Sequence, residues 1–305
     1  MSADHVHAPQ GTHRSKLTIA VGITAAILVA EVIGAWWTNS LALLVDAGYM
    51  LTAASGLLLM ALIATNLALR PPTPERTWGW RRAEVLAAGA QAAVLLAVGV
   101  YAFVEGVRRL YTPPEVTAGG LLMFGIAGLV GSIVSMLVLS SGRGANLNMR
   151  AAFLEVVNDA LGSVAVIVSA VVITLTGWTR IDALTGMLIA ALIVPRAITI
   201  LREAGSILLE STPPGLDLDE VRRHILEVPH VVGVHDLHAS TIATGLPVLT
   251  AHVVVEDACF TDGDAAQMLG DLQACVADHC DVSVEHSTFQ LEPPTYNDFE
   301  HVRHD

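Results

Sequence analysis

Six apolar runs, each about as long as a bilayer-spanning helix, dominate the first two thirds of the sequence. A helix needs roughly 20 consecutive apolar residues to cross the hydrocarbon core of a bilayer. Polar or proline-rich stretches separate the runs, and only 15% of the chain is charged, whereas soluble domains carry about 25% charged residues. The sequence therefore predicts an all-α, six-helix transmembrane domain over residues 17–205. The runs lie at 17–37, 41–69, 82–107, 117–140, 150–177 and 182–204.

The distribution of basic residues predicts the orientation of these helices. Ten lysines and arginines lie in the loops and flanks on the N-terminal side of the membrane, and three, Arg108, Arg109 and Arg180, lie on the other side. The positive-inside rule then places both termini in the cytoplasm. Residues 1–16 read as a polar cytosolic tail, and the run that follows lacks a small-residue cleavage site, so it is expected to be a span. We expect a multi-pass plasma-membrane protein, and the Ala-, Val- and Gly-rich, Lys-poor composition is typical of a GC-rich bacterial genome.

An acidic soluble domain is expected to follow the membrane part. From residue 206 onward, 18 acidic residues stand against three arginines, whereas residues 1–205 are nearly neutral. This acidity argues against a nucleic-acid partner, which binds basic patches. The pattern over residues 206–292 predicts an α+β domain of order αββαβ, and residues 293–305 are expected to be disordered. The predicted helices cover 217–228 and 262–279, and the predicted strands 231–241, 246–257 and 282–292.

Two carboxylates in the fifth run, Glu155 and Asp159, are spaced four residues apart. Residues at this spacing share one face of a helix. Carboxylates paired inside a membrane repel each other unless a cation or a proton lies between them, so the pair indicates a cation site that exchanges protons. Asp46 and Tyr49 in the second run have nearly the same spacing and are expected to face this pair. Alternatively, Glu155 lies near the helix end and reaches cytoplasmic water.

The remaining acids of the membrane runs have more than one interpretation. Asp46 supplies a metal ligand, or it serves helix packing and gating. Glu31 makes a polar contact between helices, or it belongs to the permeation path. Glu105 precedes two arginines, so an interfacial ion pair explains it. Asp182 opens the sixth run, where a helix-start role is expected.

The metal preference of any site in the bilayer follows from which residue types are missing there. All twelve histidines lie within residues 5–13 or 224–304, and the three cysteines are Cys259, Cys275 and Cys280. A membrane site must therefore be built from oxygen ligands. Such ligands suit Mn²⁺, Mg²⁺ or Ca²⁺ and can hold Fe²⁺, whereas Zn²⁺ prefers nitrogen and sulfur.

Four stretches together resemble the cation diffusion facilitators, which are six-span exporters of divalent metal with a cytosolic ferredoxin-like domain. They are AEVIGAWWTNSLALLVDAGYML at 30–51, RTWGWRRAEVLAA at 76–88, NMRAAFLEVVNDALGSVAVIV at 148–168, and the pair VHDLHASTI and VEHSTFQLE in the C-terminal part. The resemblance covers residues 15–292. It implies a ferredoxin-like fold for the C-terminal domain and export of zinc, cobalt, cadmium or a related ion.

The resemblance also implies which residues bind metal in the membrane. In zinc-type members the transport ligands are a pair four apart in the second span and a second such pair in the fifth. Those positions here are Tyr49 and Ala53, then Glu155 and Asp159. Asp159 matches, Glu155 is a substitution that can still ligate, Tyr49 is a weak neutral ligand, and Ala53 has no ligand atom.

Three histidines of the C-terminal domain, His235, His252 and His286, match positions at which family members bind metal in the cytosol. His235 and His252 lie on two predicted strands and can be cross-strand neighbours, so they could converge on a regulatory Zn²⁺. Surface or packing roles are the alternative. His238 is expected on the opposite face of its strand.

These observations favour a transporter over other classes of protein. The chain shows no nucleophile–base arrangement and no phosphate loop, so neither an enzyme nor an organic cofactor is expected. The leading hypothesis is a homodimer that exports a divalent cation in exchange for protons. The alternative is a non-transporting metal sensor or heterodimer partner of the same fold, since Tyr49 and Ala53 depart from the family pattern.

Overall fold

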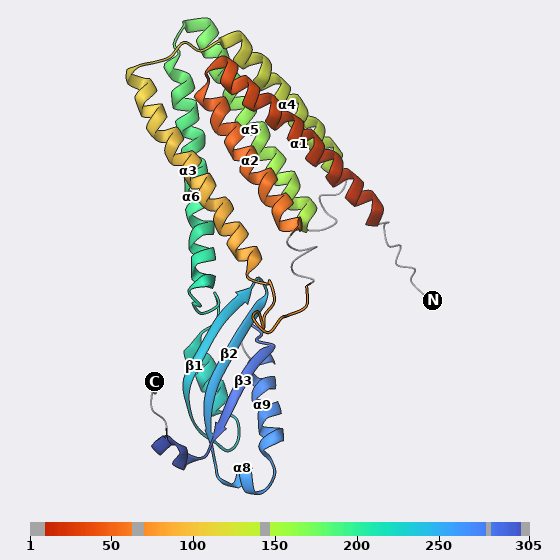
Figure 1. The fold of residues 1–305 in the computed structure, drawn as a ribbon, viewed down its shortest axis with the longest axis vertical. Helices are drawn as coiled ribbons and strands as arrows, with labels where there is room; N and C mark the ends of the chain where they lie inside the picture. Colours follow the sequence, from red (N-terminus) through yellow and green to blue (C-terminus); the bar gives the residue numbers. More distant parts are fainter. Residues whose placement is uncertain (1–9, 63–69, 141–146, 279–281, 300–305) are drawn as a thin grey trace. The chain divides into compact units, whose positions relative to one another are not determined.

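The computed structural model describes residues 10–62, 70–140, 147–278 and 282–299 of the chain. Two compact units divide it: Met1–Ala61 with Ala87–Leu201, and Leu62–Leu86 with Arg202–Asp305. Six long helices make up the N-terminal part (Figure 1), and they are called the helical bundle below. They are α1 (Gln10–Thr38), α2 (Leu41–Leu62), α3 (Ala83–Tyr111), α4 (Ala118–Ser140), α5 (Leu147–Thr176) and α6 (Arg180–Leu208).

These helices confirm the predicted six-helix membrane domain. Helices α1, α3, α4, α5 and α6 are each long and apolar enough to cross a membrane. In the part of α2 whose side chains are described, the apolar stretch covers Leu41–Thr52, and the end of the predicted second run, 63–69, lies outside the described residues. The chain is therefore a multi-pass membrane protein.

Helix α2 lies between two buried clusters of the bundle. Leu41, Val45 and Tyr49 pack with residues of α3 and α6. Ala42 and Leu43, on its other side, pack with residues of α1, α4 and α5. Polar side chains of α2 are therefore enclosed by neighbouring helices on both sides.

Small residues allow the helices to approach one another closely. A Cβ atom added to Gly99 of α3 would lie 2.5 Å from Cγ2 of Val194 on α6. Glycine at such a position brings two backbones together, which is the usual basis of helix association in a membrane because lipid supplies no hydrophobic driving force.

The two acids at one end of the bundle have structural partners. Glu105 accepts hydrogen bonds from Nε of Arg109 at 2.9 Å and from Nη1 of Arg108 at 3.4 Å, which confirms the predicted ion pair. Asp182 accepts hydrogen bonds from the Ser40 hydroxyl and, at 2.6 Å, from the backbone N–H of Leu41. It therefore caps the N-terminus of α2, a different helix from the one that the sequence suggests.

The C-terminal domain has the predicted αββαβ order. Helix α7 (Leu218–Leu226) begins after Asp217, whose carboxylate accepts hydrogen bonds from the N–H groups of Asp219 and Glu220. Strands β1 (Val231–Ala243) and β2 (Leu246–Val255) follow, then helix α9 (Ala265–Asp278) and strand β3 (His286–Glu292). The structure adds a short helix α8 (Ala258–Thr261) and, where the sequence suggested disorder, a 3-10 helix over Pro294–Phe299.

One mixed sheet organises this domain. Its strand order is β1-β2-β3, with β1 antiparallel to β2 and β2 parallel to β3. Helices α7 and α9 contact each other and the outer strands, and Figure 1 shows α9 running alongside the sheet. Apolar residues of both helices and all three strands form one buried core, which includes Ile225, Leu249, Leu272 and Phe289.

The cap that Asp182 provides should contribute measurably to stability. Replacing Asp182 by Ala leaves the Leu41 N–H and the Ser40 hydroxyl without their acceptor, so we expect a loss of about 1–3 kcal/mol in the free energy of unfolding. Thermal unfolding of the purified protein in detergent measures this change. Asp182→Asn, which keeps one acceptor oxygen, should lose less. Equal stability of Asp182→Ala and the wild type would contradict the capping role.

Candidate metal sites

The structure brings the second and fifth membrane helices together at the expected side chains. The hydroxyl of Tyr49 on α2 donates a hydrogen bond to Oε1 of Glu155 on α5, with 2.7 Å between the oxygens. Tyr49 is 8% exposed and belongs to the packed cluster that joins α2 to α3 and α6. The side chain of Ala53 lies outside the described part of the chain.

Arg196 of α6 adds a positive charge to this site, which the sequence did not predict. Nη1 of Arg196 donates a hydrogen bond to the Tyr49 hydroxyl at 2.9 Å. Nη2 of the same guanidinium lies 3.4 Å from Oε2 of Glu155. Arg196 is one of the ten basic residues that the sequence places on the N-terminal side of the membrane, and linear spacing does not reveal which helices are its neighbours. Both oxygens of Glu155 are thus engaged by protein donors.

Three other acids of the bundle are buried, and each has one carboxylate oxygen without a hydrogen-bond donor among the described residues. Glu31 on α1 is 1% exposed, Asp46 on α2 is 2% exposed and Asp159 on α5 is 4% exposed. One carboxylate oxygen of each, Oε2 of Glu31, Oδ2 of Asp46 and Oδ1 of Asp159, receives no hydrogen bond from the part of the chain that the structure describes. If they were ionised, Asp46 and Asp159 would repel each other, and both would repel Glu31. We call these three residues the buried acids.

Glycines on neighbouring helices make room for two of the buried acids. A Cβ atom on Gly162 of α5 would overlap the Asp46 carboxylate. A Cβ on Gly128 of α4 would lie 3.0 Å from Oε1 of Glu31 and 2.8 Å from the hydroxyl of Ser163. The bundle therefore holds carboxylates in space that any larger residue would fill.

The buried acids can bind cations or protons. Carboxylates in a low-dielectric interior are costly unless a counter-charge or a proton neutralises them, and intramembrane acids characteristically mark ion and proton pathways. Their donor set is oxygen only, as the sequence predicted for the membrane part. Among the described residues, however, they do not form a tight cluster of three ligand atoms; the group that does lies in the C-terminal domain.

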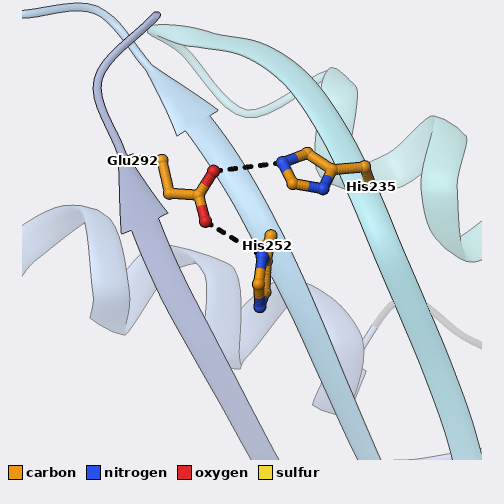
Figure 2. Close-up of side chains that lie close together, drawn as sticks. All are labelled: His235, His252 and Glu292. Atoms are coloured by element: carbon orange, nitrogen blue, oxygen red, sulfur yellow. Dashed lines mark hydrogen bonds and ion pairs between the residues drawn. The ribbon is translucent and has the colours of Figure 1, made fainter. Parts of the chain in front are cut away.

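That tight cluster consists of His235, His252 and Glu292, and Figure 2 shows the Glu292 carboxylate with one oxygen directed at each imidazole ring. Nε2 of His235 lies 3.1 Å from Oε2 of Glu292, and Nδ1 of His252 lies 2.9 Å from Oε1. One ligand atom from each residue lies within 4.8 Å of the others. His235 and Glu292 are almost fully buried, whereas the side chain of His252 is 29% exposed. We call this group the histidine–glutamate cluster.

The sheet registers explain why these three side chains meet. His235 and His252 are direct cross-strand partners of β1 and β2, as expected from the sequence. Glu292 ends β3, where it pairs with Val254, two residues beyond His252 on β2. Side chains two residues apart on a strand point to the same face. Sequence reasoning missed Glu292 because the parallel pairing of β2 with β3 was not apparent from spacing.

An irregularity in β1 adds a further carboxylate beside the cluster. The register shifts between His235 and His238, and Asp236 there has a φ of 47°. Oδ2 of Asp236 consequently lies 3.6 Å from Nδ1 of His235 and 3.8 Å from Nδ1 of His252. In a regular strand Asp236 would point to the face opposite His235. Two imidazoles and a carboxylate are ligands that suit Zn²⁺, so the residues present fit such an ion.

The other candidate ligands of this domain lie elsewhere. His286 begins β3, pairs with Val248 and contacts the ring of Trp78 at 4.9 Å. It is six residues from Glu292 along the strand, about 20 Å at the usual rise. The side chain of His238 is 62% exposed. Cys259 and Cys275 are buried thiols, while Cys280 and the N-terminal histidines fall where side chains are not described.

A bundle of membrane helices with buried acids, joined to a small domain with a cluster that could hold a metal ion, is the arrangement of a membrane transporter of metal cations. The comparisons with known proteins agree, and the chain belongs to the cation efflux family, also known as the cation diffusion facilitators. Residues 17–209 match the family model described as the cation efflux transmembrane domain, and residues 213–294 match the cytoplasmic domain of cation efflux proteins. The family consists of transporters, so the chain is not an enzyme.

Several relatives align over nearly their whole length. The metal cation efflux system protein CzcD of Cupriavidus metallidurans is 39% identical over 292 residues, which is 96% of this chain and 90% of the relative. The zinc transporter ZitB of Escherichia coli is 37% identical over 94% of this chain and 90% of its own length. A cadmium, cobalt and zinc/H⁺-K⁺ antiporter of Bacillus subtilis is 33% identical, with coverage of 94% and 92%.

Removing the carboxylate from the histidine–glutamate cluster should weaken zinc binding. Glu292→Gln has nearly the same shape but no negative charge, so we expect one class of bound Zn²⁺ to lose affinity by about tenfold or more. Equilibrium dialysis of the purified full-length protein measures this change. His286→Ala is the matched control, and we expect it to bind as the wild type does. A loss in His286→Ala with full binding in Glu292→Gln would contradict the assignment.

Proposed function

We propose that this protein exports a divalent metal cation from the cytoplasm in exchange for protons, and that the cation passes by the buried acids. The observation that carries the proposal is the set of carboxylate oxygens on Glu31, Asp46 and Asp159 that receive no hydrogen bond from the described residues of the bundle. A bound cation or protons would supply the missing charge compensation. Some relatives are named as metal efflux proteins, which supports export of the cation, and one is named as an antiporter, which supports exchange for protons.

Proton exchange follows from the chemistry of carboxylate ligands. A carboxylate must be ionised to coordinate a metal, so metal binding releases protons and protonation releases metal. Asp159 and Asp46, on facing helices, would alternate between these two occupants. The empty carrier would then return with its acids neutral, which avoids moving uncompensated charge through the bilayer. Asp159 and Glu155 remain our proposed ligands on α5, with Tyr49 contributing through its hydrogen bond to Glu155.

The membrane ligands and the names of the relatives point to different metals. The membrane ligands are oxygens, which favours ions such as Mn²⁺ or Fe²⁺ over Zn²⁺. The relatives carry names that specify zinc, cadmium and cobalt. We propose transport of zinc or a related divalent ion such as Co²⁺, Cd²⁺, Mn²⁺ or Fe²⁺, and a flux comparison among these five ions would identify it.

The C-terminal domain would regulate this transport from the cytoplasm. We propose that Zn²⁺ at the histidine–glutamate cluster favours association of two chains, since the matched cytoplasmic-domain model is named for a dimer. A ligand that binds one arrangement of a protein better than another shifts the population toward it. The surplus of basic residues in the loops of one side supports cytoplasmic placement of this domain and of both termini.

A specific observation favours a second candidate function. Tyr49 and Arg196 already engage Glu155, and Ala53 provides no ligand atom. The chain would then be a metal sensor or heterodimer partner that binds metal in its C-terminal domain and moves none. Flux separates the two candidates, because a sensor binds the ion without transporting it.

Replacing a buried acid should abolish transport. We expect Asp159→Asn to reduce proton-driven metal flux by more than about tenfold, because a neutral amide can neither exchange a proton nor offer a negative charge to a cation. The protein is reconstituted in proteoliposomes with an imposed pH gradient, and metal entry is followed with an indicator. Glu105→Gln is the matched control, since this acid also lies in a membrane helix but is paired with arginines.

Equal flux in Asp159→Asn and the wild type would contradict the role of the buried acids. If the wild type binds metal but transports none of the tested ions, the sensor or partner function would be established instead.

A further inference from the structure

We propose that the Arg196 guanidinium pairs with the Glu155 carboxylate when no metal is bound, and that the transported metal gains Glu155 as a ligand only by displacing the guanidinium. Arg196 would thereby lower the metal affinity of the membrane site. This inference rests on the proposed transport function. It adds the residue that determines how fully metal occupies the membrane site.

The geometry closes a ring of three groups from three helices. Tyr49 of α2 donates to one oxygen of Glu155 on α5, Arg196 of α6 donates to the Tyr49 hydroxyl, and the same guanidinium faces the second oxygen of Glu155. Within the described ranges, no comparable donor reaches Oδ1 of Asp159, one helical turn further along α5. Glu155 is therefore the member of this carboxylate pair that already has a cation.

The contact between the two charges is loose enough to be exchanged. The Arg196 nitrogens lie 3.4 and 3.5 Å from Oε2 of Glu155, whereas charge-assisted hydrogen bonds usually measure about 2.7–2.9 Å. The Arg109–Glu105 pair of the same bundle, at 2.9 Å, is tighter. The side chain of Arg196 is also 51% exposed, so water can take over its hydrogen bonds when it leaves.

The backbone around Arg196 has a structural feature that permits such movement. Pro195 lies inside α6, directly before Arg196. A proline within a helix removes one backbone hydrogen bond and commonly marks a kink. A small change in α6 at this point would withdraw the guanidinium from Glu155.

Competition follows because the guanidinium and the metal use the same oxygen lone pairs. Arginine stays protonated at every pH at which the protein is folded, so only movement can remove its charge. A divalent ion between Asp159 and Glu155 would also be repelled by a guanidinium that remained in place. Loss of the positive charge should therefore strengthen metal binding in the membrane.

A double-mutant cycle on the full-length protein in lipid nanodiscs tests this inference. All variants carry His235→Ala and His252→Ala, so that the histidine–glutamate cluster does not contribute, and binding of Zn²⁺ and then of Mn²⁺ is measured by equilibrium dialysis. We expect Arg196→Gln to tighten binding by about fivefold, the scale of a partly exposed ion pair. In a Glu155→Gln background the same change should have no effect. Arg196→Lys, which keeps the charge, should bring affinity back toward that of the parent.

The possible results separate this inference from the transport function. Unchanged or weaker binding in Arg196→Gln, in a protein that still carries flux, overturns the inference and leaves transport standing. Tighter binding in Arg196→Gln that persists without Glu155 also overturns it, because the arginine would then act elsewhere. Absence of membrane-site binding and of flux in every variant overturns the inference together with the proposed transport.

Discussion

The structure depends on how it compensates carboxylates that lie inside an apolar helical bundle. Each such charge costs several kcal/mol unless a partner or a proton neutralises it. Glu105 has two arginines, and Asp182 has a helix N-terminus and a hydroxyl. Glu31, Asp46 and Asp159 each keep an oxygen that no donor of the described residues reaches. The first two acids therefore have structural partners, whereas each of the last three keeps an oxygen that could receive a cation or a proton.

Helix α2 and the glycines of its neighbours make this arrangement feasible. Because α2 packs on both sides, Asp46 is enclosed while Tyr49, nearly one turn further, reaches α5 and α6. Gly162 leaves the space that the Asp46 carboxylate fills. In the C-terminal domain a buried carboxylate is compensated differently, since each oxygen of Glu292 contacts one of two histidines.

The sequence was sufficient for the fold but not for every side chain of the sites. Long apolar runs and alternating strands are local signals, and they predicted the six helices and the αββαβ order. The contact of Tyr49 with Glu155 and the pairing of His235 with His252 also followed from spacing. Arg196 and Glu292 were missed because their roles depend on which helix or strand lies beside them. Asp182 likewise caps α2 across 141 residues of chain, a contact that no local pattern encodes.

Proton exchange at the buried acids can be measured by counting the protons released when metal binds. The full-length protein with His235→Ala and His252→Ala is titrated with metal in weakly buffered solution, and a pH indicator records the release. We expect at least one proton to be released for each metal ion bound, and a smaller release in the variant that also carries Asp159→Asn. Metal binding without proton release would contradict exchange at the buried acids.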